Sequence, residues 1–172
     1  MEQKILRRLR KEDASRIAEL VNNKNIWDNL RDFIPYPYSD DDADFFINLT
    51  LNEEVHQTFG ILNDQKELCG VISVLVQADV YSKSAEIGFW IGEPHWGKGL
   101  ATKAIKEITK YGFQELKLER IYAGVFESNK GSMKALEKNG YHKEAIFKNA
   151  IIKNGKICDE HRFAMLKDKF LS

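Results

Sequence analysis

The sequence predicts an α/β or α+β protein in which helices flank one mixed central sheet of about seven strands. Runs of β-branched and aromatic residues, bounded by turn residues, gather in the middle and near the end of the chain, and helical spacing of apolar residues marks the segments around them. That distribution is typical of a sheet covered by helices. The chain has 172 residues, 43% of them hydrophobic, which suffices for one core, and no repeat or linker-like tract divides it. We therefore expect a single domain over residues 1–172.

The first third of the chain predicts a strand and two helices around an aromatic loop. The strand begins at Ile5 and ends near Arg10, and apolar residues then recur at helical spacing over 14–21. Residues 25–38 are rich in aromatic side chains, but prolines interrupt them, so we expect a loop or a short helix there. Ser39 is a suitable N-cap, and the three aspartates that follow it favour the positive end of a helix.

The remaining elements follow from the same signals. Apolar β-branched runs predict strands at 57–62, 68–76, 85–91, 120–126, 141–152 and 160–166. Helical spacing returns after Gly99 and again over 129–139, where Gly140 is a good C-terminal stop. Asn154-Gly155 is a hairpin signal that joins the last two strands.

Composition restricts the partners and the compartment. Lys and Arg together number 26, as do Asp and Glu, and this balance argues against a dedicated nucleic-acid binder. The longest apolar stretch, 71–76, is too short to span a bilayer, and the first ten residues lack the apolar core of a signal peptide. Cys69 and Cys158 fit no zinc or redox spacing, so we read both as free thiols. We expect a cytoplasmic protein with no nucleic-acid partner, no membrane partner and no metal.

The segment from Ile91 to Thr102 carries the first functional signal. An apolar strand precedes it and an amphipathic helix follows it, with Gly97 and Gly99 between them. A helix start offers unpaired backbone N–H groups, and glycines let a ligand approach closely, so a phosphate or pyrophosphate is the natural guest. The segment matches neither a Walker A loop nor a complete dinucleotide fingerprint. By itself it is equally compatible with a plain strand-to-helix turn.

A second signature identifies a family. Ser128-Asn129-Lys130-Gly131-Ser132 is followed by Glu137-Lys138-Asn139-Gly140-Tyr141, downstream of Glu86-Ile87-Gly88-Phe89-Trp90-Ile91 and the glycine turn. In this order the motifs resemble the GNAT superfamily of acetyl-CoA-dependent N-acyltransferases, and within it the RimJ/RimL-like branch, which acetylates protein N-termini and some small amines. The resemblance implies a mostly antiparallel sheet, acetyl-CoA as acyl donor, a primary amine or protein N-terminus as acceptor, and a monomer or homodimer.

The resemblance also implies a set of donor-binding residues. Backbone amides of the glycine turn would hold the pyrophosphate, and strand residues before it together with the start of the later helix would hold the pantetheine arm. These residues are Phe89, Trp90, Ile91, Trp96, Gly97, Lys98, Gly99, Leu100, Ala101, Thr102, Asn129 and Ser132. One of Lys98, Lys103, Lys130 or Lys134 would meet the 3′-phosphate, although a solvated helix face is the preferred interpretation for most of these lysines. Asn129 can also act as an N-cap.

Glu86 is the first candidate for the catalytic base. An amine is mostly protonated near pH 7 and must lose a proton before it attacks a thioester, and a carboxylate can take that proton. Strand alternation places Glu86, Gly88 and Trp90 on one face, which would look toward the acceptor. An exposed or salt-bridged strand glutamate is the alternative interpretation.

Ser132 is the candidate acid beside the leaving thiol. Many superfamily members place a tyrosine on the helix that begins at Asn129, but Glu137 stands there in this chain, whereas Ser132 matches the RimJ/RimL-like serine. In the alternative interpretation, Ser132 is only a residue of the first helical turn (position N3) whose hydroxyl bonds to the backbone. Residues 149–152 lack the glutamate that some relatives carry, and Pro94 replaces a usual Gln or Arg. These departures leave a CoA-binding module without turnover as the competing function.

Acceptor recognition is expected from the aromatic loop, because loops on a rigid scaffold often set specificity. The candidate residues are Trp27, Asn29, Leu30, Arg31, Tyr36 and Tyr38. Ordinary core cover is the alternative for the aromatic members of this set.

Overall fold

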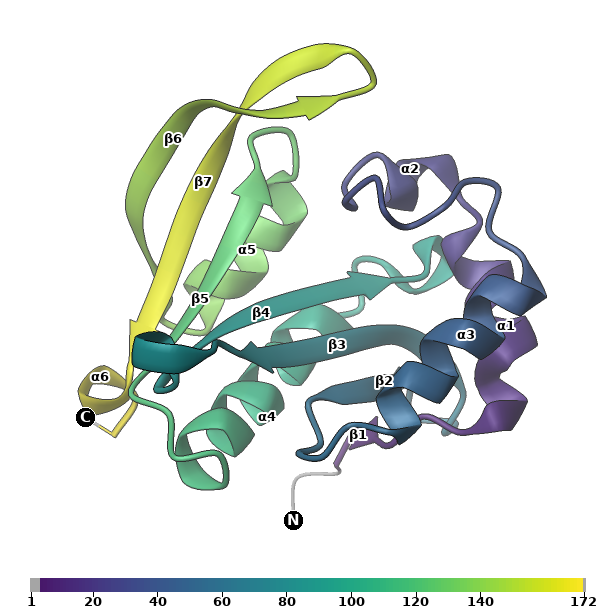
Figure 1. The fold of residues 1–172 in the computed structure, drawn as a ribbon, viewed down its shortest axis with the longest axis horizontal. Helices are drawn as coiled ribbons and strands as arrows, with labels where there is room; N and C mark the ends of the chain where they lie inside the picture. Colours follow the sequence, from purple (N-terminus) through teal and green to yellow (C-terminus); the bar gives the residue numbers. More distant parts are fainter. Residues whose placement is uncertain (1–3, 172) are drawn as a thin grey trace.

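The computed structural model describes residues 4–171, so residues 1–3 and 172 of the expected unit lie outside the described part. Seven strands form one sheet in the order β1-β2-β3-β4-β5-β7-β6 (Figure 1). The strands are β1 (Leu6–Arg7), β2 (Thr58–Leu62), β3 (Leu68–Val76), β4 (Ser84–Ile91), β5 (Arg120–Phe126), β6 (His142–Lys153) and β7 (Lys156–Leu166). The α-helices are α1 (Ala14–Val21), α2 (Lys24–Trp27), α3 (Asp40–Leu51), α4 (Leu100–Gln114), α5 (Lys130–Lys138) and α6 (Lys167–Leu171). The predicted fold class and its mostly antiparallel sheet are confirmed.

The pairing of β4 with β5 determines the shape of the sheet. This pair is parallel, whereas every other neighbouring pair of the described strands is antiparallel. Its register covers only Ser84 with Arg120, Ala85 with Ile121 and Glu86 with Tyr122. Beyond these residues the two strands separate, and Figure 1 shows them diverging from a common origin. A gap therefore opens inside the sheet, next to the second half of β4.

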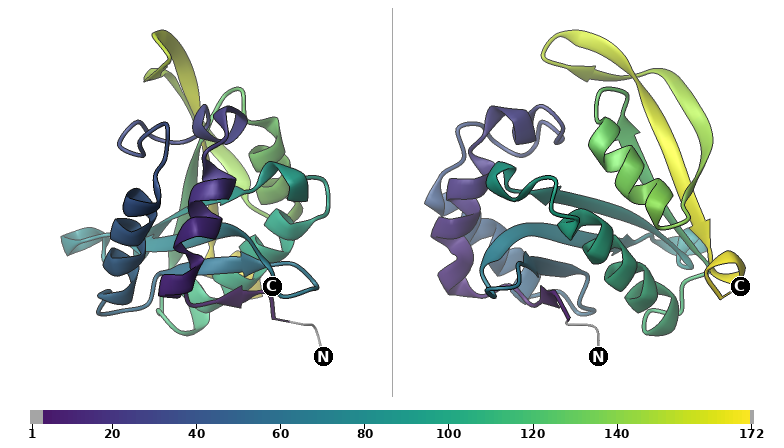
Figure 2. Two further views of the ribbon diagram at one scale, coloured as in Figure 1. Left: turned by 90° about the vertical axis from the view of Figure 1, so that its right-hand side faces the viewer. Right: turned by 180° about the vertical axis from the view of Figure 1, so that it is seen from behind.

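Helices cover both faces of the sheet. One apolar cluster joins α1 and α3 to β2 and β3, through residues such as Ile17, Ile47 and Val71. A larger cluster joins α4 and α5 to the opposite face, through residues such as Ile105 and Leu136. Seen from behind in Figure 2, α4 and α5 lie in front of the sheet.

The N-terminal strand is shorter than expected. It ends at Arg7, and a 3-10 turn at Lys11–Asp13 precedes α1. Asp13 causes this early end, because its carboxylate accepts hydrogen bonds from the Arg7 guanidinium at 2.7 Å and from the Arg10 backbone N–H at 2.8 Å. The chain must turn to make both contacts. Burial by itself would raise the pKa of Asp13, but these hydrogen bonds outweigh it and lower the pKa.

The last two strands form a long hairpin whose turn was predicted. Asn154 and Gly155 adopt positive φ values of 51° and 72°, as a tight hairpin turn of the I′ kind requires. β7 begins at Lys156, directly after this turn, so it is longer than the predicted 160–166. Cys69 and Cys158 are both free, as expected. Among residues 4–171 no helix is long and apolar enough to cross a membrane.

Candidate functional site

Two cavities meet in the gap between β4 and β5. One has a volume of about 520 Å³ and opens between the aromatic loop, α3 and the sheet, and the other, of about 560 Å³, extends toward the glycine turn and α5. We call them the acceptor cavity and the donor cavity. Their shared lining residues are Asn29, Leu30, Phe89, Trp90, Asn129 and Ser132. Two ligands entering from different sides would therefore meet beside the end of β4.

The donor cavity ends at the start of α4, as the glycine motif predicted. Gly97 and Gly99 have φ values of 73° and 76°, a backbone region that L side chains rarely adopt, and no atom lies within 4 Å of a Cβ built on either. Both glycines therefore leave open space beside the unpaired N–H groups of the first helical turn. Unpaired N–H groups at a helix start favour an anion such as a phosphate. Among residues 4–171 no cluster of His, Cys, Asp and Glu could hold a metal ion.

Most of the predicted donor-binding residues line this cavity. They are Phe89, Trp90, Ile91, Trp96, Gly97, Gly99, Leu100, Ala101, Thr102, Asn129 and Ser132. Lys98 is not among the lining residues, because its Nζ turns back to the carbonyl of Pro94 at 3.0 Å. Lys130 and Lys134 do line the cavity, and so does Lys138, which sequence reasoning did not single out. His95 also lines it, and burial, with help from Lys98 and Arg16, lowers its pKa, so its ring is neutral at pH 7.

Backbone groups of β4 face the gap. On the β3 side the Gly92 N–H donates to the Cys69 carbonyl at 2.7 Å, and Trp90 is the partner of Val71. Alternation along an antiparallel ladder then directs the N–H and C=O groups of Phe89 and Ile91 away from β3, toward the gap. The Trp96 indole N–H already donates to the Ile91 carbonyl at 2.6 Å. The backbone of Trp90, by contrast, faces β3, so Trp90 contributes its side chain to the two cavities.

Asn129 and Ser132 lie at the start of α5, where both cavities meet. The Asn129 side-chain oxygen accepts a hydrogen bond from the Ser132 N–H at 3.1 Å, so Asn129 does act as the N-cap of this helix. This bond fixes the first turn of α5 beside the gap. Glu137 is exposed and lines neither cavity.

Glu86 lines the acceptor cavity and has an arginine partner. Its Oε1 lies 2.5 Å from an Arg31 guanidinium nitrogen, and its side chain is 20% exposed. Burial alternates along β4 as predicted, because Ala85 and Ile87 belong to the core under α4 while Glu86 and Gly88 line the cavity. The two residues are 55 positions apart, so this ion pair had no sequence signal.

The remaining wall of the acceptor cavity is largely apolar. Phe33, Leu49 and Leu75 come from three separate segments, line the cavity and remain 79%, 56% and 45% exposed. Glu53 also lines it, but its carboxylate accepts hydrogen bonds from the Thr58 hydroxyl at 2.7 Å and from two backbone N–H groups. Both carboxylates of this cavity, Glu53 and Glu86, thus already have protein partners.

The aromatic loop divides into residues that line the cavities and residues that support them. Asn29, Leu30, Arg31 and Tyr38 line the acceptor cavity. Burial, aided by Asp42, raises the pKa of Tyr38 to about 12, so its hydroxyl is protonated at neutral pH. Trp27 and Tyr36 line neither cavity, and their rings pack together with centroids 5.4 Å apart.

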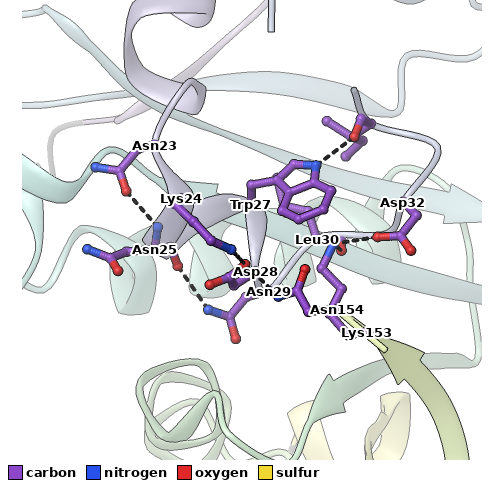
Figure 3. A network of polar contacts seen from close by, with 11 residues as sticks. Asn23, Lys24, Asn25, Trp27, Asp28, Asn29, Leu30, Asp32, Lys153 and Asn154 are labelled. Atoms are coloured by element: carbon purple, nitrogen blue, oxygen red, sulfur yellow. Dashed lines mark hydrogen bonds and ion pairs between the residues drawn. The ribbon is translucent and has the colours of Figure 1, made fainter. Parts of the chain in front are cut away.

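The tip of the β6–β7 hairpin holds this loop. Lys153 Nζ donates to the Leu30 carbonyl at 2.8 Å and to Asp32 at 2.6 Å, and it lies 3.4 Å from the centroid of the Trp27 ring (Figure 3). Sequence reasoning missed Lys153, because only the folded hairpin brings it beside a loop more than 120 residues earlier.

Comparison with known proteins agrees with this geometry. Residues 4–142 match the acetyltransferase (GNAT) domain. A probable N-acetyltransferase of Bacillus subtilis, YjcK, is 40% identical over 115 residues, which cover 66% of this chain and 62% of that protein. The ribosomal-protein-serine acetyltransferase of Escherichia coli is 27% identical over 121 residues, covering 70% of this chain and 67% of that protein.

A solved structure resembles the whole chain. The spermidine N-acetyltransferase of Vibrio cholerae, in complex with CoA and spermine, superposes with a TM-score of 0.83 at 28% identity and covers 97% of both chains. The domain match spans most of the sequence, and the glycine turn and the start of α5 both line the donor cavity. This chain therefore belongs to the GNAT family of N-acetyltransferases.

Proposed function

We propose that this enzyme transfers an acetyl group from acetyl-CoA to a primary amine by direct attack, with both substrates bound at once. The observation that carries the proposal is the meeting of two cavities beside the end of β4. Such an arrangement brings a donor and an acceptor together without an enzyme nucleophile. Cys69 is buried, and burial raises the pKa of its thiol, which disfavours a covalent acetyl-enzyme.

The donor would lie between the glycine turn and α5. The first N–H groups of α4 would bind the pyrophosphate, and Lys130, Lys134 or Lys138 would meet the 3′-phosphate. The Phe89 backbone N–H and C=O groups would hold the pantetheine arm, which leaves the Ile91 N–H for the thioester carbonyl. Bound in this way, acetyl-CoA supplies the thioester carbonyl that the amine attacks.

In the proposed mechanism Glu86 removes a proton from the acceptor ammonium, directly or through a water molecule. The lone pair that this frees forms the new C–N bond. The Ile91 N–H, which faces the gap, donates a hydrogen bond to the carbonyl oxygen as negative charge develops there. When the C–S bond breaks and the carbonyl re-forms, Ser132 or a water molecule that it positions gives a proton to the sulfur. This proton donor regains a proton from the nitrogen, which must lose its second proton to become the amide. Arg31 keeps the Glu86 carboxylate oriented at the cavity wall.

The apolar wall of the acceptor cavity favours an acceptor whose amine is attached to an apolar group. Filling the space beside Phe33, Leu49 and Leu75 with hydrocarbon would remove their exposed surface from water. A polyamine would need a further carboxylate for its distal ammonium groups, but Glu53, the other carboxylate of this cavity, already accepts hydrogen bonds from the Thr58 hydroxyl and two backbone N–H groups. We further place the enzyme in the RimJ/RimL-like branch and in the cytoplasm, as a monomer or homodimer.

The experiment that tests this function measures CoA release from acetyl-CoA with a thiol reagent. The panel contains phenethylamine, spermidine, an amino sugar, and peptides that begin with alanine, serine or phenylalanine. We expect turnover with at least one amine and preference for an apolar one. Preference for spermidine would contradict the proposed acceptor but not the reaction. No turnover, together with tight acetyl-CoA binding in isothermal titration, would favour the CoA-binding module instead.

Glu86→Gln tests the base. We expect kcat to fall by roughly 10²-fold or more near pH 7, because the amide cannot accept the ammonium proton, while the Kd for acetyl-CoA stays unchanged. Steady-state kinetics and titration calorimetry measure the two quantities. Glu12→Gln is the control, since Glu12 is exposed and lines neither cavity. Unchanged kcat in Glu86→Gln would remove Glu86 from the mechanism.

A further inference from the structure

Lys153 is a buried charge outside the proposed chemistry. Only 8% of the residue is exposed, and a lysine is seldom buried unless it is paired. Its ammonium group has three partners on the aromatic loop: the Leu30 carbonyl, the Asp32 carboxylate and the face of Trp27 (Figure 3). These partners satisfy a charge that would otherwise be costly to bury.

The residues around Lys153 reinforce this attachment. Asn154 donates from Nδ2 to the Asp28 carboxylate at 2.8 Å, and Asp28 also pairs with Lys24 at 2.6 Å. Trp27 in turn donates its indole N–H to the Ile34 carbonyl at 2.8 Å. The loop from 28 to 34 is thus bound to the hairpin tip on one side and to α2 on the other.

The attachment crosses the gap in the sheet. The hairpin belongs to the half that contains β5, because β7 pairs with β5 along seven residues. The aromatic loop belongs to the other half, because Leu30 packs against the apolar cluster of α1, α3 and β3. At one end of the gap the halves are joined by three β4–β5 register pairs, and on the aromatic-loop side Lys153 joins them again.

We infer that Lys153 is a positioning residue that fixes the acceptor side of the site. It holds the Leu30 carbonyl and the Asp32 side chain, and Arg31 lies between them. Arg31 lines the acceptor cavity and pairs with Glu86, so its position sets both the wall and the orientation of the proposed base. The inference rests on the proposed function. The glycine turn and α5 take no part in these contacts, so the phosphate-binding end of the donor cavity is independent of Lys153.

Lys153→Met tests this role, because methionine keeps much of the apolar stem but removes the ammonium group. With the acceptor amine found in the CoA-release panel, we expect its KM to rise about tenfold, and the Kd for acetyl-CoA to change less than about twofold. Lys153→Arg, which can still donate to Leu30 and Asp32, should recover most of the acceptor affinity. Amide hydrogen exchange of residues 28–34, a readout that needs no acceptor, should accelerate in Lys153→Met.

Two further variants keep the test decisive. Lys156→Met removes an exposed lysine from the same hairpin and should change neither KM nor exchange. Asp32→Asn removes one partner whose side chain is 62% exposed, so folding should survive even where Lys153→Met fails to fold. Unchanged acceptor KM and unchanged exchange in both Lys153→Met and Asp32→Asn would overturn the inference. If no amine is acetylated, the proposed function fails. The hydrogen-exchange rates of residues 28–34 then decide by themselves whether Lys153 holds the aromatic loop.

Discussion

The backbone at Gly99 has a conformation that other residues adopt only with strain. We expect Gly99→Ala to lower the free energy of unfolding by about 1–2 kcal/mol and to weaken acetyl-CoA binding, because the positive φ and not a steric clash is the obstacle. Urea denaturation and titration calorimetry measure both effects. Gly88→Ala is the matched stability control, since it also has open space around a Cβ but no positive φ. Equal losses of stability in the two variants would contradict this explanation.

Individual residues also show where sequence reasoning stops. The glycine turn was predictable because a local order of apolar strand, glycines and helical spacing determines it, and both glycines adopt positive φ. The role of Asn129 as an N-cap was equally local and is confirmed. The partner of Glu86 was not predictable, because Arg31 comes from a distant loop whose path depends on tertiary contacts. The assignment of Glu86 as base and Ser132 as acid remains a prediction.

Helix α3 shows how a local signal supports one wall of the acceptor cavity. Ser39 and Asp42 form a capping box, in which the Ser39 hydroxyl accepts from the Asp42 N–H at 3.1 Å. Ser39→Ala should therefore cost about 1 kcal/mol of stability, as measured by urea denaturation. Asp41→Asn is the control, because it alters the first turn but leaves the box intact, and it should cost clearly less. A loss as large in Asp41→Asn would point to the helix dipole instead of the cap.

At the level of elements, features that depend on neighbouring residues were predicted correctly, whereas features that depend on contacts between distant residues were missed. The Asn154-Gly155 turn was predicted because two residues with positive φ suffice to reverse a strand. The early end of β1 was missed, because it depends on Asp13 binding Arg7 and the Arg10 backbone after the chain has folded. Trp27 and Tyr36, which were candidates for acceptor recognition or for core cover, line neither cavity; their rings pack together, and Lys153 lies over the Trp27 ring.

For the whole molecule, the tyrosines predict a loss of stability at alkaline pH. Burial, with Asp42, raises the pKa of Tyr38 to about 12, and burial also raises the pKa values of Tyr111, Tyr122 and Tyr141. An unfolded tyrosine ionises near pH 10. The contribution of each raised pKa is therefore fully present below about pH 10 and is lost as pH rises through the higher folded value.

Urea denaturation between pH 8 and pH 12 would measure this loss. Tyr38→Phe should reduce the dependence on pH, because phenylalanine cannot ionise. Tyr81→Phe is the control, since Tyr81 is 67% exposed. If the free energy of unfolding falls equally steeply with pH in Tyr38→Phe and in the unmodified protein, Tyr38 does not contribute to the loss of stability.

The separation of β4 and β5 has a consequence for the molecule as a whole. It gives the seven-stranded sheet two internal edges, where backbone groups of β4 and β5 beyond the three paired positions have no neighbouring strand. An extended ligand arm bonded to the Phe89 backbone would take the place of a neighbouring strand beside the second half of β4. The acyl donor would thereby complete the sheet along this stretch of β4 as well as supply the acetyl group.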